Sequence, residues 1–198
     1  MHWCIASSSI IYLAAPIYFK MKHTLIILLL IIAGADLFAQ NYSPADASSE
    51  VRFTIKNFGL SVNGSFKGLK GKITFIPDNP AASSVNVSVD AATVNTGNGS
   101  RDKHLKKDDY FDATNHTVLT FVSTKITGKA GAYNIEGGIT IKGITKKISF
   151  PFTATPVANG YRLQGQFKLN RRDFNVGGSS WVLSDDLTVS LNISAIKQ

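Results

Sequence analysis

Apolar and polar residues alternate along most of the chain from about residue 50 onward. Segments 51–55 and 187–193 show the pattern most clearly, since every second residue in them is apolar. A period of two is typical of strands with one face buried and the other in water. Shorter stretches of the same pattern occur at residues 73–75, 85–89, 118–126, 139–141, 148–152, 161–163 and 167–169.

Clusters of Gly, Asn, Asp and Pro separate these segments. Asn63-Gly64 and Asn159-Gly160 predict hairpin connections, because Asn and Gly accept the positive φ angles that two-residue turns require. Further turns are predicted at 77–80, 128–131 and 137–138. No long segment has a helical period, and a short helical segment is predicted only near residues 101–111. The chain is therefore expected to be all-β, with about eight antiparallel strands.

A sheet of this size with one apolar face either packs on a second sheet or closes into a barrel, which removes its exposed edges. The interior of an eight-stranded barrel is filled by side chains or holds one small ligand. Of the 12 Phe, all but Phe19 and Phe38 follow residue 39, and many occupy alternating strand positions. Periodicity alone favours an ordinary aromatic core over a ligand cavity.

The first 39 residues are interpreted as lying outside the domain. From Met21, a short basic start precedes an apolar run at 25–33, and Ala39 precedes Gln40. This order is typical of a secretory signal peptide, here residues 21–39, cleaved after a small residue. Residues 1–20 are interpreted as a mis-assigned upstream start, with a longer membrane anchor as the alternative. The domain then covers residues 40–198.

The charge and cysteine content limit the kinds of site that this domain is expected to contain. Lys20 and Lys22 account for two of the 21 basic residues, and Asp36 for one of the 13 acidic ones, which leaves a scattered net charge of +7 after residue 39. The single cysteine, Cys4, precedes the domain, so we expect neither a disulfide nor a cysteine-based metal site.

The stretch 100–112 (SRDKHLKKDDYFD) concentrates ionisable side chains. Its four basic and four acidic residues cancel, whereas a nucleic-acid surface needs a net positive patch. We therefore expect no nucleic-acid binding. The favoured interpretation is a short helical cap with an Asp102–Lys106 ion pair, and with Leu105 and Phe111 turned inward.

His104 is the candidate for catalysis within this stretch. Four positions separate it from Asp108, so the two can pair on a helix. A lipid- or ester-modifying enzyme that uses His104 is therefore one alternative function. No Gly-x-Ser-x-Gly nucleophile motif accompanies it, and His116 lies too far along the chain to suggest a metal site.

Four motifs, in order, resemble the YceI-like, polyisoprenoid-binding family. The opening F-x-I-K pattern lies within 51–71, and TGNGSRDKHLKKDDYFDATNHTVLTF follows at 96–121. GITIKGITK occupies 138–146, and LNRRDFNVG occupies 169–177 before the closing strand. The resemblance implies a lipocalin-like antiparallel barrel, exported to the bacterial periplasm, that holds a long isoprenoid or similar lipid. One departure is Asn115-His116-Thr117, where the family usually has a Pro before the strand.

The combined prediction is a non-catalytic carrier of an isoprenoid, quinone-like or fatty-acid-derived lipid, without metal or other cofactor. A stress-linked structural protein with a filled core is a further alternative. Transient membrane contact and a homodimer are predicted as further interactions. Arg171 has two interpretations, a contact with the polar head of the lipid and a fastening of its loop to the barrel. One face of the strands is predicted to line the cavity, with Phe53, Ile55, Phe75, Val87, Phe121, Ile141, Phe150, Phe152, Phe167 and Leu191.

Overall fold

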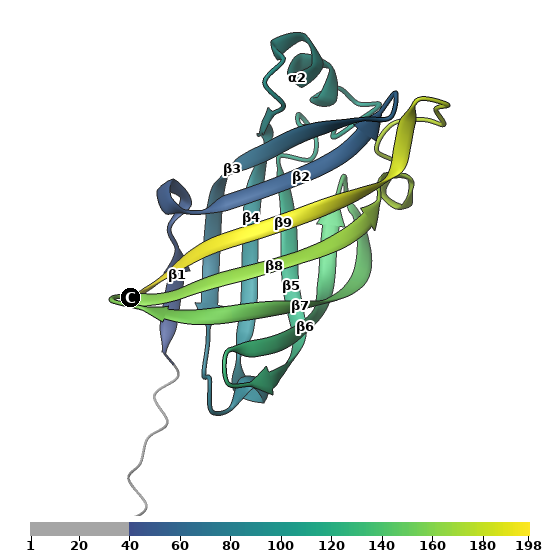
Figure 1. Ribbon diagram of the computed structural model, residues 1–198. Coiled ribbons are helices and arrows are strands. Elements are labelled where there is room, and N and C mark those ends of the chain that lie inside the picture. Colours follow the sequence, from purple (N-terminus) through teal and green to yellow (C-terminus); the bar gives the residue numbers. More distant parts are fainter. Residues whose placement is uncertain (1–39) are drawn as a thin grey trace, which may run out of the picture. The chain divides into compact units, whose positions relative to one another are not determined.

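The computed structural model of the protein describes residues 40–198, so the interpretations of residues 1–20 and 21–39 lie outside the described residues. The described part is built almost entirely from strands (Figure 1). The strands are β1 (Asn41–Pro44), β2 (Glu50–Asn57), β3 (Leu60–Thr74), β4 (Ser84–Asn95), β5 (Val118–Lys129), β6 (Ala132–Ile141), β7 (Ile144–Val157), β8 (Gly160–Asn170) and β9 (Leu183–Lys197). The helical elements are α2 (Gly99–Leu105) and three 3-10 turns, η1 (Asp46–Ser48), η2 (Pro80–Ala82) and η3 (Arg171–Phe174).

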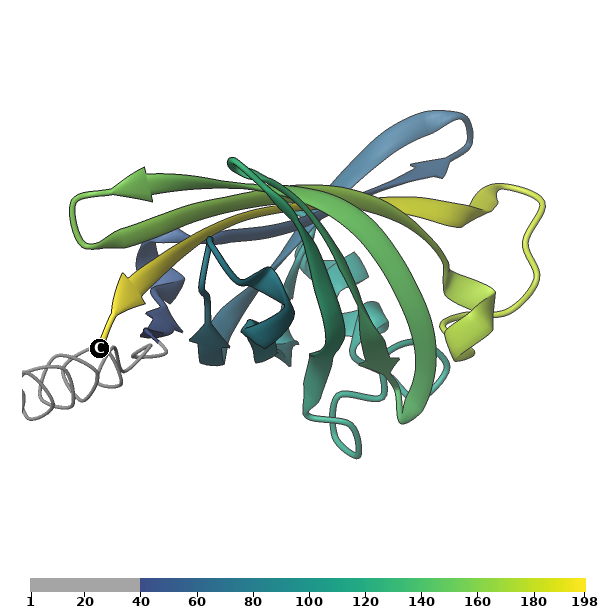
Figure 2. The ribbon, with the colours of Figure 1, turned by 90° about the horizontal axis from the view of Figure 1, so that it is seen from below.

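Eight of the strands form a closed antiparallel barrel, as predicted. Their order is β3-β2-β9-β8-β7-β6-β5-β4, and pairing between β3 and β4 closes the ring. Figure 2 shows the long strands curving around a common interior. The short strand β1 was not predicted. It pairs with the end of β3 and the end of β9, where Tyr42 faces Ile73 and Lys197.

The barrel contains its own core. The described residues contain three clusters of buried side chains, and the strand pairings among these residues span 41–197. The described residues therefore hold what an independently folding domain needs, namely a closed sheet and a hydrophobic core. Among them, no helix has the length and apolar character required to cross a membrane.

Two of the predicted turns are wrong. Asn63 and Gly64 lie inside β3, and the β2–β3 hairpin turns earlier, at Phe58-Gly59. Gly137-Gly138 likewise lies inside β6. In both places glycine provides space, because a Cβ on Gly64 would collide with the ring of Phe53, and one on Gly137 with the ring of Phe121. The other predicted turns are present with small shifts, since the chain turns at 77–78, at 130–131 and at 158–159, one residue before the predicted Asn159-Gly160.

The predicted helical cap is present as α2 and the turns after it. Asn98 caps the helix, since its side-chain oxygen accepts a hydrogen bond from the Arg101 amide at 3.1 Å. Leu105 and Phe111 turn inward, and the Phe111 ring lies 5.3 Å from that of Phe66.

The ion pairs predicted within the cap are wrong. Asp102 accepts hydrogen bonds from the backbone amide and hydroxyl of Thr96, at 2.8 and 2.6 Å, instead of pairing with Lys106. His104 approaches Asp109, not Asp108. The physical reason is that α2 ends at Leu105, so the i,i+4 geometry of a helix does not continue to residue 108.

Candidate functional site

The barrel encloses a cavity of about 540 Å³. All eight strands of the ring contribute to its wall, and most of the lining side chains are apolar. The volume is within the range of small-molecule sites, roughly 300–1,000 Å³. The interior of this barrel is therefore hollow along part of its length.

Most of the residues predicted to line a cavity lie on its wall. They come from seven different strands, and the alternation of each strand turns them inward. Nine of the ten predicted residues line the cavity, namely Phe53, Ile55, Val87, Phe121, Ile141, Phe150, Phe152, Phe167 and Leu191.

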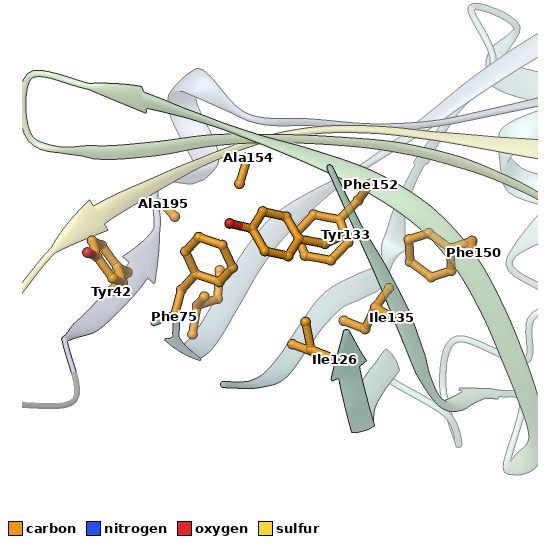
Figure 3. Close-up of a cluster of buried hydrophobic side chains, with 10 residues drawn as sticks. Tyr42, Phe75, Ile126, Tyr133, Ile135, Phe150, Phe152, Ala154 and Ala195 are labelled. Atoms are coloured by element: carbon orange, nitrogen blue, oxygen red, sulfur yellow. The ribbon is translucent and has the colours of Figure 1, made fainter. Parts of the chain in front are cut away.

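Phe75 is the exception, because it lies in a packed region that closes one end of the barrel. Its ring is 5.1 Å from Tyr133 and 5.0 Å from Tyr161, both edge to face. Tyr42 and Phe152 complete this group, which we call the aromatic plug, and Figure 3 labels all of its members except Tyr161. Edge-to-face rings at such distances pack densely and favourably. Phe75 therefore forms part of the floor below the cavity and not of its wall.

Four of the five plug rings are buried, those of Tyr42, Phe75, Tyr133 and Phe152, whereas Tyr161 is half-buried. Tyr42 is almost fully buried, and its hydroxyl donates a hydrogen bond to Oε1 of Gln40 at 2.6 Å. Burial raises the pKa of Tyr42, and the neighbouring Tyr161 adds to this effect. The Tyr42 hydroxyl thus remains a neutral donor at physiological pH.

The opposite end of the barrel forms the mouth of the cavity. Four lining residues that are also exposed lie there: Phe58, His104, Ser180 and Val182. They belong to the β2–β3 hairpin, α2 and the segment before β9. Figure 1 shows these three elements at the upper end, away from the β7–β8 hairpin. The backbone amide of Phe58 donates to the carbonyl of Val182 at 2.8 Å, which joins two sides of the mouth.

Polar side chains of the α2 region form part of this mouth. Arg101 donates from Nε to the hydroxyl of Thr96 at 2.7 Å, and from Nη2 to its carbonyl at 2.9 Å. His104 Nε2 lies 3.6 Å from Oδ2 of Asp109, and its ring is 4.9 Å from that of Tyr110. Arg101 therefore fastens the helix to the end of β4, while His104 stands half-exposed at the opening.

The catalytic alternative requires a nucleophile activated by His104 through a hydrogen bond. Within residues 40–198, no hydrogen bond joins the His104 side chain to a serine, and the Asp109 contact is longer than a normal hydrogen bond. The same residues contain no group of three or more His, Cys, Asp or Glu side chains that could hold a metal ion.

Arg171 fastens the segment between β8 and β9. Its side chain is buried, and all five of its N–H groups are used. Nη2 donates to Oδ1 of Asp185 at 2.6 Å, and the other bonds go to the backbone carbonyls of Val176, Gly178, Leu183 and Ser184. The lipid-head interpretation of Arg171 is therefore not favoured, because no donor is left for a ligand.

Sequence reasoning missed several wall residues, on β3 and on other strands. There Phe66 lines the cavity together with Leu69 and Ile73, although their numbers differ in parity. The β3–β4 pairing shifts register between Lys67 and Lys70, where β3 has one residue more than β4, and this bulge reverses the face of β3 that points inward. Six other missed wall residues could have been predicted, because they alternate with residues already assigned to the wall. They are Ile135, Ile139, Leu163, Leu169, Val189 and Ile193.

Comparisons with known proteins agree with this architecture. The model of the YceI-like domain matches residues 42–195. A UPF0312 protein of Pectobacterium carotovorum is 30% identical over 192 residues, covering 90% of this chain and 99% of that protein. The crystal structure of Burkholderia cenocepacia BcnA has a TM-score of 0.72 and 26% identity, over 76% of this chain and 98% of that one.

A polyisoprenoid-binding domain from Saccharophagus degradans, implicated in plant cell wall breakdown, shares the fold. Its TM-score is 0.65 at 17% identity, over 79% of this chain and 98% of that domain. The resemblance seen in the four sequence motifs is thus confirmed by a match that covers nearly the whole barrel, and the chain belongs to the YceI-like family.

Proposed function

We propose that this protein is a non-catalytic binding protein for a long apolar lipid, which it holds inside the barrel. The observation that carries the proposal is the apolar cavity of about 540 Å³ between the aromatic plug and the mouth. The structural neighbour from Saccharophagus degradans is described as polyisoprenoid-binding, which supports an isoprenoid as one candidate ligand. A quinone-like lipid and a fatty-acid derivative fit the same chemistry.

The driving force is the transfer of hydrocarbon from water into a preformed apolar space. Burying several hundred Å² of chain at roughly 25 cal/mol per Å² gives several kcal/mol. Part of this is lost when the ligand gives up its translational and conformational freedom. The closed barrel keeps that loss small on the protein side, because its wall is formed before the ligand arrives.

The two ends of the cavity fix the direction of the ligand. A hydrocarbon tail fits against the aromatic plug, where the lining is apolar and closed. A polar head fits at the mouth, near His104 and Ser180, which line the cavity and are exposed to water. Specificity then comes from the depth of the cavity and from a few polar groups at its opening.

The periplasm is the proposed location, and the signal-like order of residues 21–39 supports it. No cofactor other than the bound lipid is required, because the proposed mechanism makes and breaks no covalent bond. Self-association is a separate prediction, which sedimentation velocity tests directly.

Thermal melting of lipid-stripped protein tests the proposal. Geraniol, farnesol and geranylgeraniol differ by one isoprene unit each, so they probe cavity length at constant chemistry. We expect the melting temperature to rise along this series, since a ligand that binds only the folded state stabilises it. Melting that stays unchanged with all three alcohols, and with long-chain fatty acids, would contradict the proposal.

A further inference from the structure

Four apolar side chains protrude at the mouth of the cavity. Phe58 and Leu60, on the β2–β3 hairpin, are each 74% exposed, and Trp181 and Val182 precede β9, with Trp181 fully exposed. The Phe58–Val182 backbone hydrogen bond joins the two segments, and Figure 1 shows them side by side. We call these four side chains the apolar tip.

The backbone of the β2–β3 turn is strained at Phe58, which carries one of the aromatic side chains of the tip. Phe58 has a φ of 52° and Gly59 a φ of 77°, which is the arrangement of a two-residue hairpin turn that favours Asn-Gly. A bulky residue with positive φ costs stability. Because Phe58 is mostly exposed, little burial within the chain offsets this cost. Its position therefore points to a contact outside the barrel.

The apolar tip is continuous with the cavity. Phe58 and Val182 belong both to the cavity lining and to the exposed surface. An apolar path thus leads from the interior of the barrel to the outer ends of the two segments.

We propose that the apolar tip inserts into the surface of a phospholipid bilayer and sets the mouth of the cavity against it. This inference rests on the proposed function, because the contact lets a lipid move between bilayer and barrel without crossing water. Tryptophan and phenylalanine are favoured at the boundary between head groups and acyl chains.

The charges near the tip suit a bilayer that contains anionic lipids. Segments 51–63 and 176–184 have no acidic residue, whereas Arg52 and Lys56 are basic. Two acidic residues follow the second segment, and of these Asp185 is paired with Arg171 and Asp186 accepts a hydrogen bond from Asn170. Arg52 is paired with Glu50 at 2.9 Å, which leaves Lys56 as the exposed cation next to the tip. Basic residues close to a membrane are attracted by its negative surface potential.

A second protein is a poorer fit to the apolar tip. Stable protein–protein interfaces bury about 800 Å² on each partner and use roughly 20–30 residues a side. The tip offers four side chains on the ends of two segments, which is a shape suited to insertion and not to a flat interface.

Trp181 provides a direct test. In a chain that begins at Gln40 it is the only tryptophan, since the other of the two is Trp3. We expect its emission to shift to shorter wavelength with vesicles of phosphatidylethanolamine and phosphatidylglycerol, and the protein to sediment with them. An emission spectrum that vesicles leave unchanged would overturn the proposal.

Three variants locate the contact. Leu60→Ser and Phe58→Asn should each weaken vesicle binding about tenfold, since each removes one large apolar side chain from the inserted surface. Val157→Ser, at the β7–β8 hairpin, changes an apolar residue that is also exposed but lies away from the mouth, and should leave binding unchanged. Equal vesicle binding by all three variants overturns the proposal. It is also overturned if sedimentation velocity without vesicles shows a wild-type dimer that Leu60→Ser converts to monomers, because the tip is then a contact between two copies of the chain.

The failure of this inference can be told apart from failure of the proposed function. Protein that carries lipid but does not bind vesicles overturns the bilayer contact alone. Protein that neither carries lipid nor can be loaded with it overturns the proposed function, whatever the vesicle result. Native mass spectrometry of the same samples reports the lipid content.

Discussion

The two ends of the barrel use the same alternation of residues for opposite purposes. At one end, Tyr42, Phe75, Tyr133 and Tyr161 pack edge to face, and the first three are almost fully buried. At the other, Phe58 and its neighbours in the apolar tip leave the interior accessible and face water. The two ends differ in the segments that lie next to the ring of eight strands. At the closed end, β1 adds Tyr42 to the packed rings. At the mouth, the turns leave their apolar side chains in water.

Removal of a ring from the closed end should have the largest effect. Phe75→Ala leaves a cavity within a dense cluster and should lower the free energy of unfolding by roughly 3–5 kcal/mol. Phe121→Ala, on the cavity wall, should cost only about 1–2 kcal/mol in lipid-free protein, because part of its surface already faces a void. Urea unfolding measures both. Equal losses would mean that the interior is packed alike at both sites.

Arg171→Leu tests what holds the mouth together. The change leaves four backbone carbonyls without their donor and should lower the free energy of unfolding by about 3 kcal/mol. Arg172→Leu is the matched control, because Arg172 is the exposed neighbour in η3 and should change stability by less than about 0.5 kcal/mol. Unchanged melting of Arg171→Leu together with loss of bound lipid would instead establish Arg171 as the head-group contact.

Addition of volume should separate the two ends in the same way. Ala154→Phe inserts a ring next to the aromatic plug and should cost about 1–3 kcal/mol, as overpacking does. Val87→Phe places the same ring on the cavity wall, where there is room, and should cost less than about 1 kcal/mol in lipid-free protein. Differential scanning calorimetry of both variants checks this. A larger loss for Val87→Phe would contradict a hollow interior.

The smallest expected effect is a gain. Phe58→Asn places a residue that tolerates positive φ in the β2–β3 turn and should stabilise the barrel by about 1 kcal/mol. Leu60→Ser, two positions along, relieves no such strain and should be neutral. Urea unfolding of this pair decides whether the turn is strained. A loss of stability in Phe58→Asn would show that the ring contributes to the fold itself.

Much of the fold was predictable because its determinants are local. Alternation marks the long strands, and glycine-containing turns mark several hairpins. The strand β1 was missed because four residues are too few to show a period. Gly64 and Gly137 were misread because their role, giving space to a ring on a neighbouring strand, depends on pairings that sequence does not display.

The candidate site was predictable in part for the same reason. Alternation identifies inward faces on β2, β4 and β9, where Phe53, Val87 and Leu191 line the cavity. It cannot say whether an inward residue meets a void or another ring, so Phe75 was placed on the wall. The alternation pattern also could not decide between the two interpretations of Arg171, because its five hydrogen-bond acceptors come together only in the folded loop.

Native mass spectrometry of the protein purified from the cells that make it tests the central claim most directly. The wild-type protein should carry the added mass of one long-chain lipid, and Val87→Phe, with its cavity partly filled, should carry less of it or a shorter chain. Both proteins at the bare mass of the polypeptide, with no lipid recovered on extraction, would contradict the account.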